Sequence, residues 1–340
     1  MRILVTGGTG FTGSHLVRRL IRDGHSVVAV DNQKGLFWSE LDSLGAELHL
    51  ASVTDRDRMY ELAEGCDLVF HLAAAFRKVN LPKSAYWNIN VEGTRYLLEA
   101  ARRSRVPKFV YCSTCGVHGN VDNPPAAEDA PIKPEDYYQY TKWEGERVAH
   151  EFMAQGMDVT IIRPAAIYGP GDPERFFMLF RRVATGRFTM FGDGRTTYHP
   201  LYIDNLVDAF VLAAGVPASR GQTYLIADEH YYSLNDLVHA IADALGIQVR
   251  ITYLPFAPLW LAAVLCETAC KPLRVSPPLF RRRVDWFRQN RAFDITKARR
   301  ELGYQPKVDL ASGLRETALW YREMGYLPAG LPRAASPAAD

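Results

Sequence analysis

Residues 1–16 read MRILVTGGTGFTGSHL and combine three kinds of segment. An apolar run ends at Thr6, three glycines follow at a spacing of three residues (Gly7, Gly10 and Gly13), and an amphipathic segment comes next. Glycine permits a tight turn and lets backbone N–H groups approach a bound pyrophosphate. The first turn of the helix then faces the negative charge. The stretch therefore predicts a strand, a phosphate-binding loop and a helix, in that order.

The next apolar run leads directly into Asp31 and Asn32. Asp31 lies 18 residues after Gly13, close to the spacing at which an acidic residue binds the 2′-hydroxyl of a dinucleotide ribose. A carboxylate there repels the 2′-phosphate of NADP, and Asn32 supplies no positive charge to offset that repulsion. The sequence therefore predicts NAD as the cofactor. The alternative interpretation is a tight strand–helix turn that binds no ligand.

The first 165 residues continue the alternation that these segments begin. Short apolar runs that we expect to be strands cover Ile3–Val5, Val27–Val30, Leu68–Leu72, Phe109–Tyr111 and Val159–Ile162. Amphipathic segments that we expect to be helices lie between them and cover Ser14–Arg22, Asp57–Ala63 and Val91–Arg103. In the rest of the chain we expect helices over Asn205–Ala214, Leu234–Leu245 and Leu310–Glu323, with short strands between them. This alternation predicts an α/β fold whose parallel sheet is covered by helices on both faces.

Glycine and proline become frequent between Pro164 and Gly194, and this loop composition marks the end of the regular sheet domain. We therefore expect a first domain over residues 1–165, to which later segments return. A second domain is expected over residues 166–327. Residues 328–340 are small and rich in proline, which predicts a disordered tail.

A tyrosine and a lysine share one face of an expected helix in YYQYTKWEGER, residues 137–147. Tyr138 and Lys142 are four positions apart, so their side chains lie on the same side of the helix. An ammonium group beside a phenol lowers the pKa of the phenol, and such a tyrosine can exchange a proton at neutral pH. The pair follows the hydroxyl cluster Ser113–Thr114 by about 25 residues. The alternative interpretation of the pair is a solvated helix face.

Together these segments resemble the extended short-chain dehydrogenase/reductases, the NAD-dependent epimerase/dehydratase superfamily. Beside Tyr138 and Lys142, the matching stretches are TGGTGFTG (6–13), HLAA (71–74), NVEGT (90–94), STCGVHG (113–119), RPAAIYGPGD (163–172), YIDNLVDAF (202–210) and FDITKARRELGYQP (293–306). The resemblance extends over about residues 1–325. It implies a Rossmann-type doubly wound parallel sheet, a smaller C-terminal α/β substrate domain and an enzyme that uses NAD.

The resemblance also implies a role for each residue of the expected site. Tyr138 corresponds to the catalytic acid/base, and Lys142 to the residue that tunes its pKa and binds the nicotinamide ribose. Thr114 corresponds to the hydroxyl that hydrogen-bonds the reacting oxygen, with Ser113 as the alternative. The expected cofactor contacts are Gly7, Gly10, Phe11, Thr12, Gly13, Asp31, Asn32, Ser52, Val53, Leu72, Ala73, Ala74, Ser113, Tyr138, Lys142, Pro164 and Ala165. The expected substrate contacts are Thr114, Cys115, His118, Ala166 and Tyr198, and Asn90 is expected to be structural.

Three departures from the family pattern reduce the number of candidate activities. Dehydratases of this family carry Asp-Glu after the catalytic threonine, where this chain has Cys115 and Gly116, so we expect no dehydratase. Nucleotide-sugar epimerases usually carry an asparagine and a diphosphate-binding arginine at the positions of Ala166 and Tyr198. Other basic residues that can bind the diphosphate are Arg187, Arg195 and the run Arg281–Arg283.

The stretches GRTTYHPLYIDNLVDAFVLAA (194–214) and LPFAPLWLAAVLCE (254–267) are similar to the 3β-hydroxysteroid dehydrogenase-like branch. We therefore predict an oxidoreductase that interconverts a secondary alcohol and a ketone on an apolar or amphipathic small molecule. The first alternative is an NAD-dependent nucleoside-diphosphate-sugar epimerase of the UDP-sugar 4-epimerase type, which uses the same Tyr138 and Lys142. The second alternative is a non-catalytic dinucleotide-sensing or scaffold protein.

The apolar segment Leu254–Cys266 has three interpretations. The first is a core helix of the substrate domain, the second an apolar lid or pocket wall, and the third a contact with a membrane surface. Thirteen residues interrupted by prolines are too few to span a bilayer.

Composition excludes several classes of protein. Lysine and arginine number 40 against 38 aspartates and glutamates, so the chain lacks the basic excess of a nucleic-acid-binding protein. No signal-peptide pattern and no apolar run of about 18 residues is present. The five cysteines form neither a disulfide framework nor a paired metal site, so we expect a cytoplasmic protein without a metal. The family resemblance implies a homodimer formed through helices 91–103 and 137–152.

Overall fold

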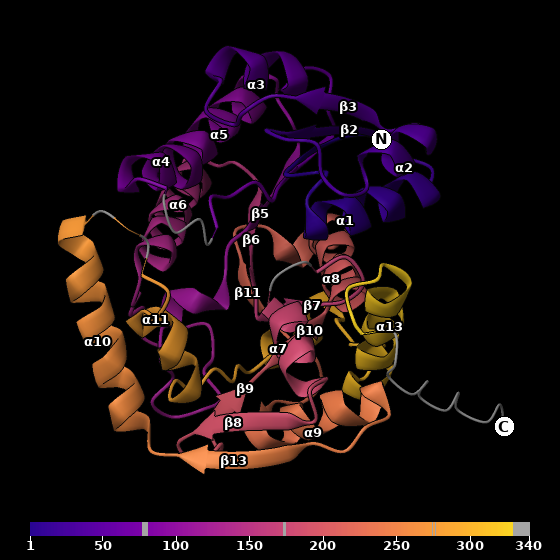
Figure 1. Cartoon of the computed structure of the whole chain (residues 1–340). Helices are drawn as coiled ribbons and strands as arrows, with labels where there is room; N and C mark the ends of the chain where they lie inside the picture. Colours follow the sequence, from indigo (N-terminus) through magenta and orange to yellow (C-terminus); the bar gives the residue numbers. More distant parts are fainter. Residues whose placement is uncertain (77–80, 173–174, 274, 276, 329–340) are drawn as a thin grey trace, which may run out of the picture.

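A seven-stranded parallel sheet forms the centre of the computed structural model, which describes residues 1–76, 81–172, 175–273, 275 and 277–328 (Figure 1). The strand order is β11-β6-β5-β4-β1-β2-β3. The strands are β1 (Arg2–Thr6), β2 (Ser26–Asp31), β3 (Glu47–Leu50), β4 (Leu68–His71), β5 (Lys108–Cys112), β6 (Val159–Pro164) and β11 (Thr223–Ile226). The order reverses direction between β1 and β4, and ligands of such sheets bind where the order reverses.

Helices cover both faces of this sheet, as apolar strands require. One face packs against α1 (Phe11–Arg22), α2 (Trp38–Ser43), α8 (Ile203–Gly215) and α12 (Thr296–Leu302). The other packs against α3 (Arg56–Ala63), α5 (Gly93–Arg103) and α6 (Tyr137–Ala154). The short helix α4 (Lys83–Trp87) and a π-helical turn (Asn88–Glu92) lead into α5.

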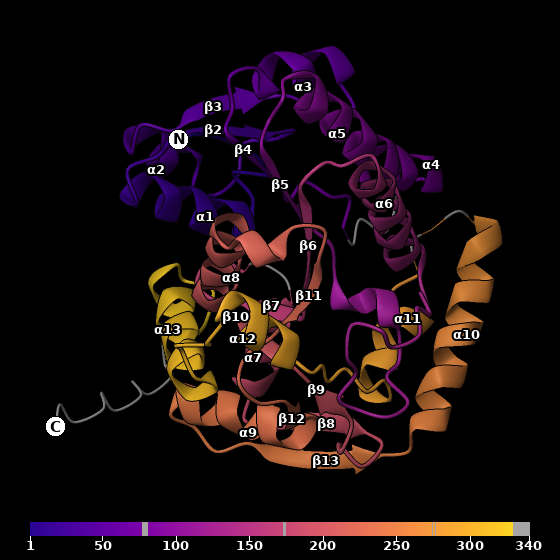
Figure 2. The same ribbon diagram turned by 180° about the vertical axis from the view of Figure 1, so that it is seen from behind.

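A smaller layer below the sheet has its own core (Figures 1 and 2). Its helices are α7 (Arg175–Val183), α9 (Leu234–Leu245) and α13 (Leu310–Glu323), with α10 (Phe256–Leu273) and α11 (Arg281–Val284) at the edge. Its paired strands are β7 (Ala166–Tyr168) with β10 (Pro200–Tyr202), β8 (Arg187–Phe191) with β13 (Arg250–Leu254), and β9 (Thr197–Tyr198) with β12 (Tyr232–Ser233).

A buried polar network joins the sheet to the C-terminal segment. The side-chain amide of Asn205 in α8 donates to Asp228 Oδ1 (2.8 Å) and to the carbonyl of Val308 (2.9 Å), and its oxygen accepts from the backbone N–H of Lys307 (2.9 Å). The Asp228 carboxyl also accepts from the backbone N–H of Tyr202 (2.9 Å). Burial raises the pKa of Asp228 to about 7. The network therefore fixes the loop after β11 against α8.

The predicted α/β architecture is confirmed, and the observed strands and helices overlap the expected ones. Two strands of the large sheet, β3 and β11, lie outside the expected strand ranges, as do the short paired strands of the smaller layer. The expectation of a core helix over residues 254–266 is wrong. A helix forms over Phe256–Leu273, but among its described side chains only Ala263 is buried. The expected disordered tail lies outside the described residues apart from Pro328. No helix in the described part of the chain is long and apolar enough to cross a membrane.

Candidate active site

The glycine loop between β1 and α1 forms a concave backbone surface. Gly7 has a φ of +68°, a conformation that favours glycine. A Cβ atom on Gly13 would lie 2.0 Å from the carbonyl oxygen of Gly7, so no side chain fits there. Gly10 caps α1 and supplies no side-chain hydrogen bond, so the first N–H groups of the helix at Phe11 and Thr12 face the loop. This arrangement suits a diphosphate.

Asp31 ends β2 beside this loop and is half-buried. Its Oδ2 accepts from the hydroxyl (3.1 Å) and the backbone N–H (3.3 Å) of Thr9, and its Oδ1 accepts from the backbone N–H of Asn32 (2.9 Å). Burial raises the pKa of Asp31, while these hydrogen bonds lower it. The carboxylate is thereby held at the rim of the glycine loop, where it can accept from ribose hydroxyl groups.

The segment after β4 lies against the glycine loop. A Cβ atom on Gly7 would come within 2.8 Å of the backbone nitrogen of Ala73, so the two chain segments are in close contact. The expected cofactor contacts Leu72, Ala73 and Ala74 are partly exposed along this segment. Asn90 holds the end of this segment in place, because its side-chain amide oxygen accepts a hydrogen bond from the backbone N–H of Ala75 (2.7 Å).

The remaining expected cofactor contacts divide between two places. Ser52 follows β3, and its hydroxyl forms a hydrogen bond with that of Thr54 (2.8 Å). Val53 is buried and leaves no room for a side chain on Gly93. Pro164 ends β6, and the backbone N–H of Ala165 donates to the carbonyl of Ile226 in β11 (2.9 Å).

Lys142 is a buried cation on α6, one turn after Tyr138. Its Nζ atom lies 4.3 Å from the centre of the Tyr111 ring, and no described residue forms an ion pair with it. Burial lowers the pKa of Lys142 to about 8. The Tyr138 ring packs edge-on against Phe76 at 4.9 Å. The helix therefore presents a phenol with a desolvated ammonium group on the same face.

The two hydroxyl groups after β5 have different surroundings. Ser113 is buried, and its hydroxyl donates to Glu146, which forms a buried ion pair with Arg163 (2.6 Å). Thr114 is half-buried, and its hydroxyl oxygen accepts from the backbone N–H of Gly116 (3.0 Å). No described residue accepts the hydrogen of the Thr114 hydroxyl. Thr114 is therefore the better candidate to donate to a substrate oxygen.

Most of the residues that were expected to contact the substrate are instead buried against other parts of the protein. The Cys115 thiol is buried and donates to the carbonyl of Arg163 (3.0 Å), and burial raises its pKa. His118 is buried with its Nε2 atom 3.1 Å from the Arg163 guanidinium. Ala166 and Tyr198 are buried in the core of the smaller layer. Of the five expected substrate residues, Thr114 alone retains a half-exposed side chain.

A hollow of about 390 Å³ opens at the N-terminal end of α6. Sequence reasoning pointed to Trp260 as a pocket wall and to the arginines of residues 281–283. It missed Gln139, Arg288 and Arg291, because no local pattern marks them. The lining residues are Glu135, Asp136, Gln139, Trp260, Glu267, Arg281, Asp285, Arg288, Gln289 and Arg291. Three guanidinium groups and an indole thus lie close to the helix that carries Tyr138.

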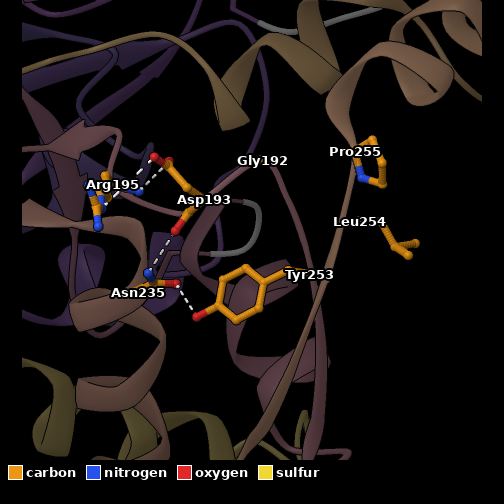
Figure 3. Close-up of a pocket in the computed structure, with 7 residues that line it drawn as sticks. All are labelled: Gly192, Asp193, Arg195, Asn235, Tyr253, Leu254 and Pro255. Atoms are coloured by element: carbon orange, nitrogen blue, oxygen red, sulfur yellow. Dashed lines mark hydrogen bonds and ion pairs between the residues drawn. The ribbon is translucent and has the colours of Figure 1, made fainter.

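A second hollow of about 560 Å³ lies on β8, α9 and β13 (Figure 3). The side-chain amide of Asn235 donates to the carbonyl of Asp193 (3.0 Å) and accepts from the Tyr253 hydroxyl (3.2 Å). Leu254 and Pro255 lie apart from this polar group. None of the expected catalytic or cofactor residues lines this hollow.

The first region fits a dinucleotide: a cradle with no room for side chains, a helix start and a half-buried carboxylate occur together. The model of the NAD dependent epimerase/dehydratase family matches residues 3–227. The chain belongs to this family. It is therefore an NAD-dependent enzyme, as predicted, and the interpretation as a non-catalytic scaffold is wrong.

Individual relatives of this family member differ in their activities. A UDP-glucose 4-epimerase from Mycolicibacterium smegmatis is 35% identical over 338 residues, which cover 95% of this chain and 99% of that protein. A 3beta-hydroxysteroid-dehydrogenase/decarboxylase (isoform 2) from Arabidopsis thaliana is 30% identical and covers 92% of this chain and 61% of that protein. The structure of a UDP-glucose 4-epimerase with UDP-glucose from Thermotoga maritima has a TM-score of 0.77 and 27% identity, and covers 95% of this chain and 99% of that one.

Proposed function

We propose that this family member is an NAD-dependent 4-epimerase of a nucleoside-diphosphate sugar. The observation that carries the hydride chemistry of the proposal is the buried ammonium of Lys142, which has no ion-pair partner among the described residues and lies one turn after Tyr138. An isolated buried cation is costly, and a phenolate partner in the catalytic cycle offsets that cost. The relative with 35% identity over almost both whole chains supports the epimerase over the oxidoreductase that the sequence favoured.

In this reaction Tyr138, Lys142 and Thr114 would each have a separate role. Tyr138 accepts the proton of the sugar hydroxyl while Lys142 stabilises the phenolate, and Thr114 donates a hydrogen bond to the reacting oxygen. NAD supplies a site that takes up the hydride and later returns it. Tyr138 gives its proton back when the hydride returns to the opposite face of the ketone. The net reaction inverts one carbon centre and consumes no cofactor.

The hollow at the start of α6 supports a substrate that carries a diphosphate. Arg281, Arg288 and Arg291 line it, and guanidinium groups bind phosphate oxygens in pairs. Arg281 pairs with Glu267 (2.8 Å) and Arg288 with Asp285 (2.6 Å), so a diphosphate would have to take the place of these carboxylates on both guanidinium groups. In this proposal they replace the arginine that sugar epimerases carry where this chain has Tyr198.

A second candidate is the oxidoreductase on an apolar or amphipathic alcohol. Two observations favour it: the hollow includes the indole of Trp260, and the adjoining segment 254–266 has no charged side chain. The 30% identical steroid dehydrogenase/decarboxylase supports the same reading. In that case the cofactor leaves after each turnover.

The state of the cofactor in the purified protein distinguishes the two candidates. Protein purified without added NAD is denatured, and the released dinucleotide is measured by mass spectrometry. The epimerase predicts near-stoichiometric NAD, and turnover of a UDP-hexose to its 4-epimer that Tyr138→Phe abolishes. An empty site, no reaction with UDP-sugars and NAD-dependent oxidation of a hydroxysteroid would favour the second candidate.

We also propose that the protein forms a homodimer through α5 and α6, as the family resemblance implies. Light scattering coupled to gel filtration tests it. A monomer at micromolar concentration contradicts the proposal.

A further inference from the structure

Helix α10 leaves a row of large apolar side chains uncovered. The helix stands at the outer edge of the molecule in both views (Figures 1 and 2). Leu261 is 54% exposed, Leu265 61% and Trp260 37%, and Leu254 just before the helix is 45% exposed. Leu261 and Leu265 are four positions apart and therefore lie on one face. An exposed apolar stripe of this kind is typical of a surface that contacts another protein or a membrane.

Polar contacts, rather than a core, hold α10 in place. Glu267 accepts from the Arg281 guanidinium at 2.8 Å, and the Arg288 guanidinium lies 5.6 Å from the centre of the Phe256 ring. Ala263 is the single buried side chain among those described in the helix. The helix is therefore attached along its inner face, and its outer face remains available.

Basic side chains lie at one end of this face. Residues 254–266 contain no acidic or basic side chain. Near the C-terminal end of α10, Lys271 and Arg283 are exposed, and the Glu267 carboxylate of the helix is paired with Arg281. Near the N-terminal end, Arg195 lies 4.0 Å from Asp193 in the hollow that Leu254 also lines, so these two charges offset each other. The face is thus apolar over most of its length and positively charged at its C-terminal end.

We propose that α10 docks the protein on an anionic phospholipid surface. Its leucines and Trp260 would enter the interface between headgroups and acyl chains, and Lys271 and Arg283 would bind lipid phosphates. The helix lies on the surface and does not span the bilayer.

Docking in this way has a consequence for access to the site. Trp260 belongs both to the exposed face of α10 and to the lining of the hollow at the start of α6. The mouth of that hollow therefore lies next to the lipid surface.

Sedimentation with vesicles tests the proposal on the full-length protein, without NAD or substrate. Sucrose-loaded vesicles of phosphatidylcholine are compared with vesicles that also contain phosphatidylglycerol. The wild-type protein is expected to sediment with the second kind, less so at high salt. The double variant Leu261→Glu/Leu265→Glu is expected to lose at least about tenfold in the bound fraction, because charges now replace the apolar contacts.

The matched control is the double variant Leu44→Glu/Leu319→Glu. Leu44 lies at the C-terminal end of α2 and Leu319 lies in α13, and their side chains are 45% and 53% exposed. This control is expected to bind vesicles as the wild type does. Unchanged melting temperatures for both double variants show that folding is intact. Three results would overturn the proposal: wild-type protein that remains in the supernatant with both vesicles, equal binding by the α10 variant, or conversion of a dimer to a monomer by that variant. The last result assigns the face to a second copy. None of these results bears on the epimerase proposal, because no turnover is measured.

Discussion

Lys142 carries an ionisable amino group in a buried site, where the charged form is disfavoured. Burial lowers its pKa to about 8, and no described carboxylate pairs with it. In Lys142→Met we expect activity to fall by at least about 100-fold, because the Tyr138 phenolate loses its stabilising charge. We expect the melting temperature to stay the same or rise, because methionine fills similar space without a buried charge. Steady-state kinetics and calorimetry on the same preparation check both expectations. A variant that melts earlier and remains active contradicts the assignment.

The neighbouring hydroxyl groups Ser113 and Thr114 provide a matched pair of substitutions. Thr114→Ala is expected to lower kcat by about 10-fold or more with little change in stability, because it removes a donor to the reacting oxygen. Ser113→Ala is expected to lower the melting temperature and leave kcat nearly unchanged, because Glu146 loses a buried partner. The reverse pattern would transfer the catalytic role to Ser113.

At this scale the sequence predicted residues whose chemistry depends on local spacing, such as the glycines, Asp31 and the Tyr138–Lys142 pair. It did not predict the ion pair between Glu146 and Arg163, which also contacts the side chains of Ser113 and His118. Glu146 and Arg163 lie 17 positions apart on different elements, and no local pattern connects them. One signal was present: Glu146 continues the helix face of Tyr138 and Lys142 at the same four-residue spacing.

The junction between β1 and α1 depends on the absence of side chains. Gly13→Ala places a Cβ atom 2.0 Å from the Gly7 carbonyl oxygen, so the loop must move. We expect NAD affinity to fall by more than about tenfold, equivalent to about 1.4 kcal/mol. Gly215→Ala at the end of α8 meets no atom within 4 Å, and we expect it to bind NAD normally and to be as stable as the wild type or slightly more stable. Isothermal titration and thermal melts compare the two. Equal NAD affinity in both variants would remove the loop from the cofactor site.

The elements with clear periodicity could be predicted, and α9 and α13 coincide with the expected ranges. The short strands β3 and β11 could not, because four residues of ordinary composition give little signal without their partners. The exposed position of α10 could not be predicted either. Composition shows that a segment is apolar, but the neighbouring elements decide whether it is covered.

Across the whole molecule, Asp228 connects the sheet to the C-terminal segment and titrates in an accessible range. Its pKa is raised from 3.8 to about 7 by burial, so the folded protein binds this proton more tightly than the unfolded chain. The stabilising contribution is complete below pH 3.8 and is lost as the pH rises through 7. We therefore expect the melting temperature of the wild type to fall relative to that of Asp228→Asn as the pH rises from 5 to 8. Calorimetry over this range checks it, and a constant difference would contradict the assigned pKa.

The position of β11 limits how modular this enzyme can be. β11 is hydrogen-bonded beside β6 at the edge of the large sheet, although the chain builds β7 to β10 between these two strands. The family match correspondingly ends at residue 227, one position after β11. A fragment cut after residue 165 would leave the β6 edge open to pairing with other chains. The smallest unit that can be transplanted to another protein is therefore discontinuous in sequence, because α8, β11 and α12, which belong to the large sheet and one of its faces, alternate along the chain with the elements of the smaller layer.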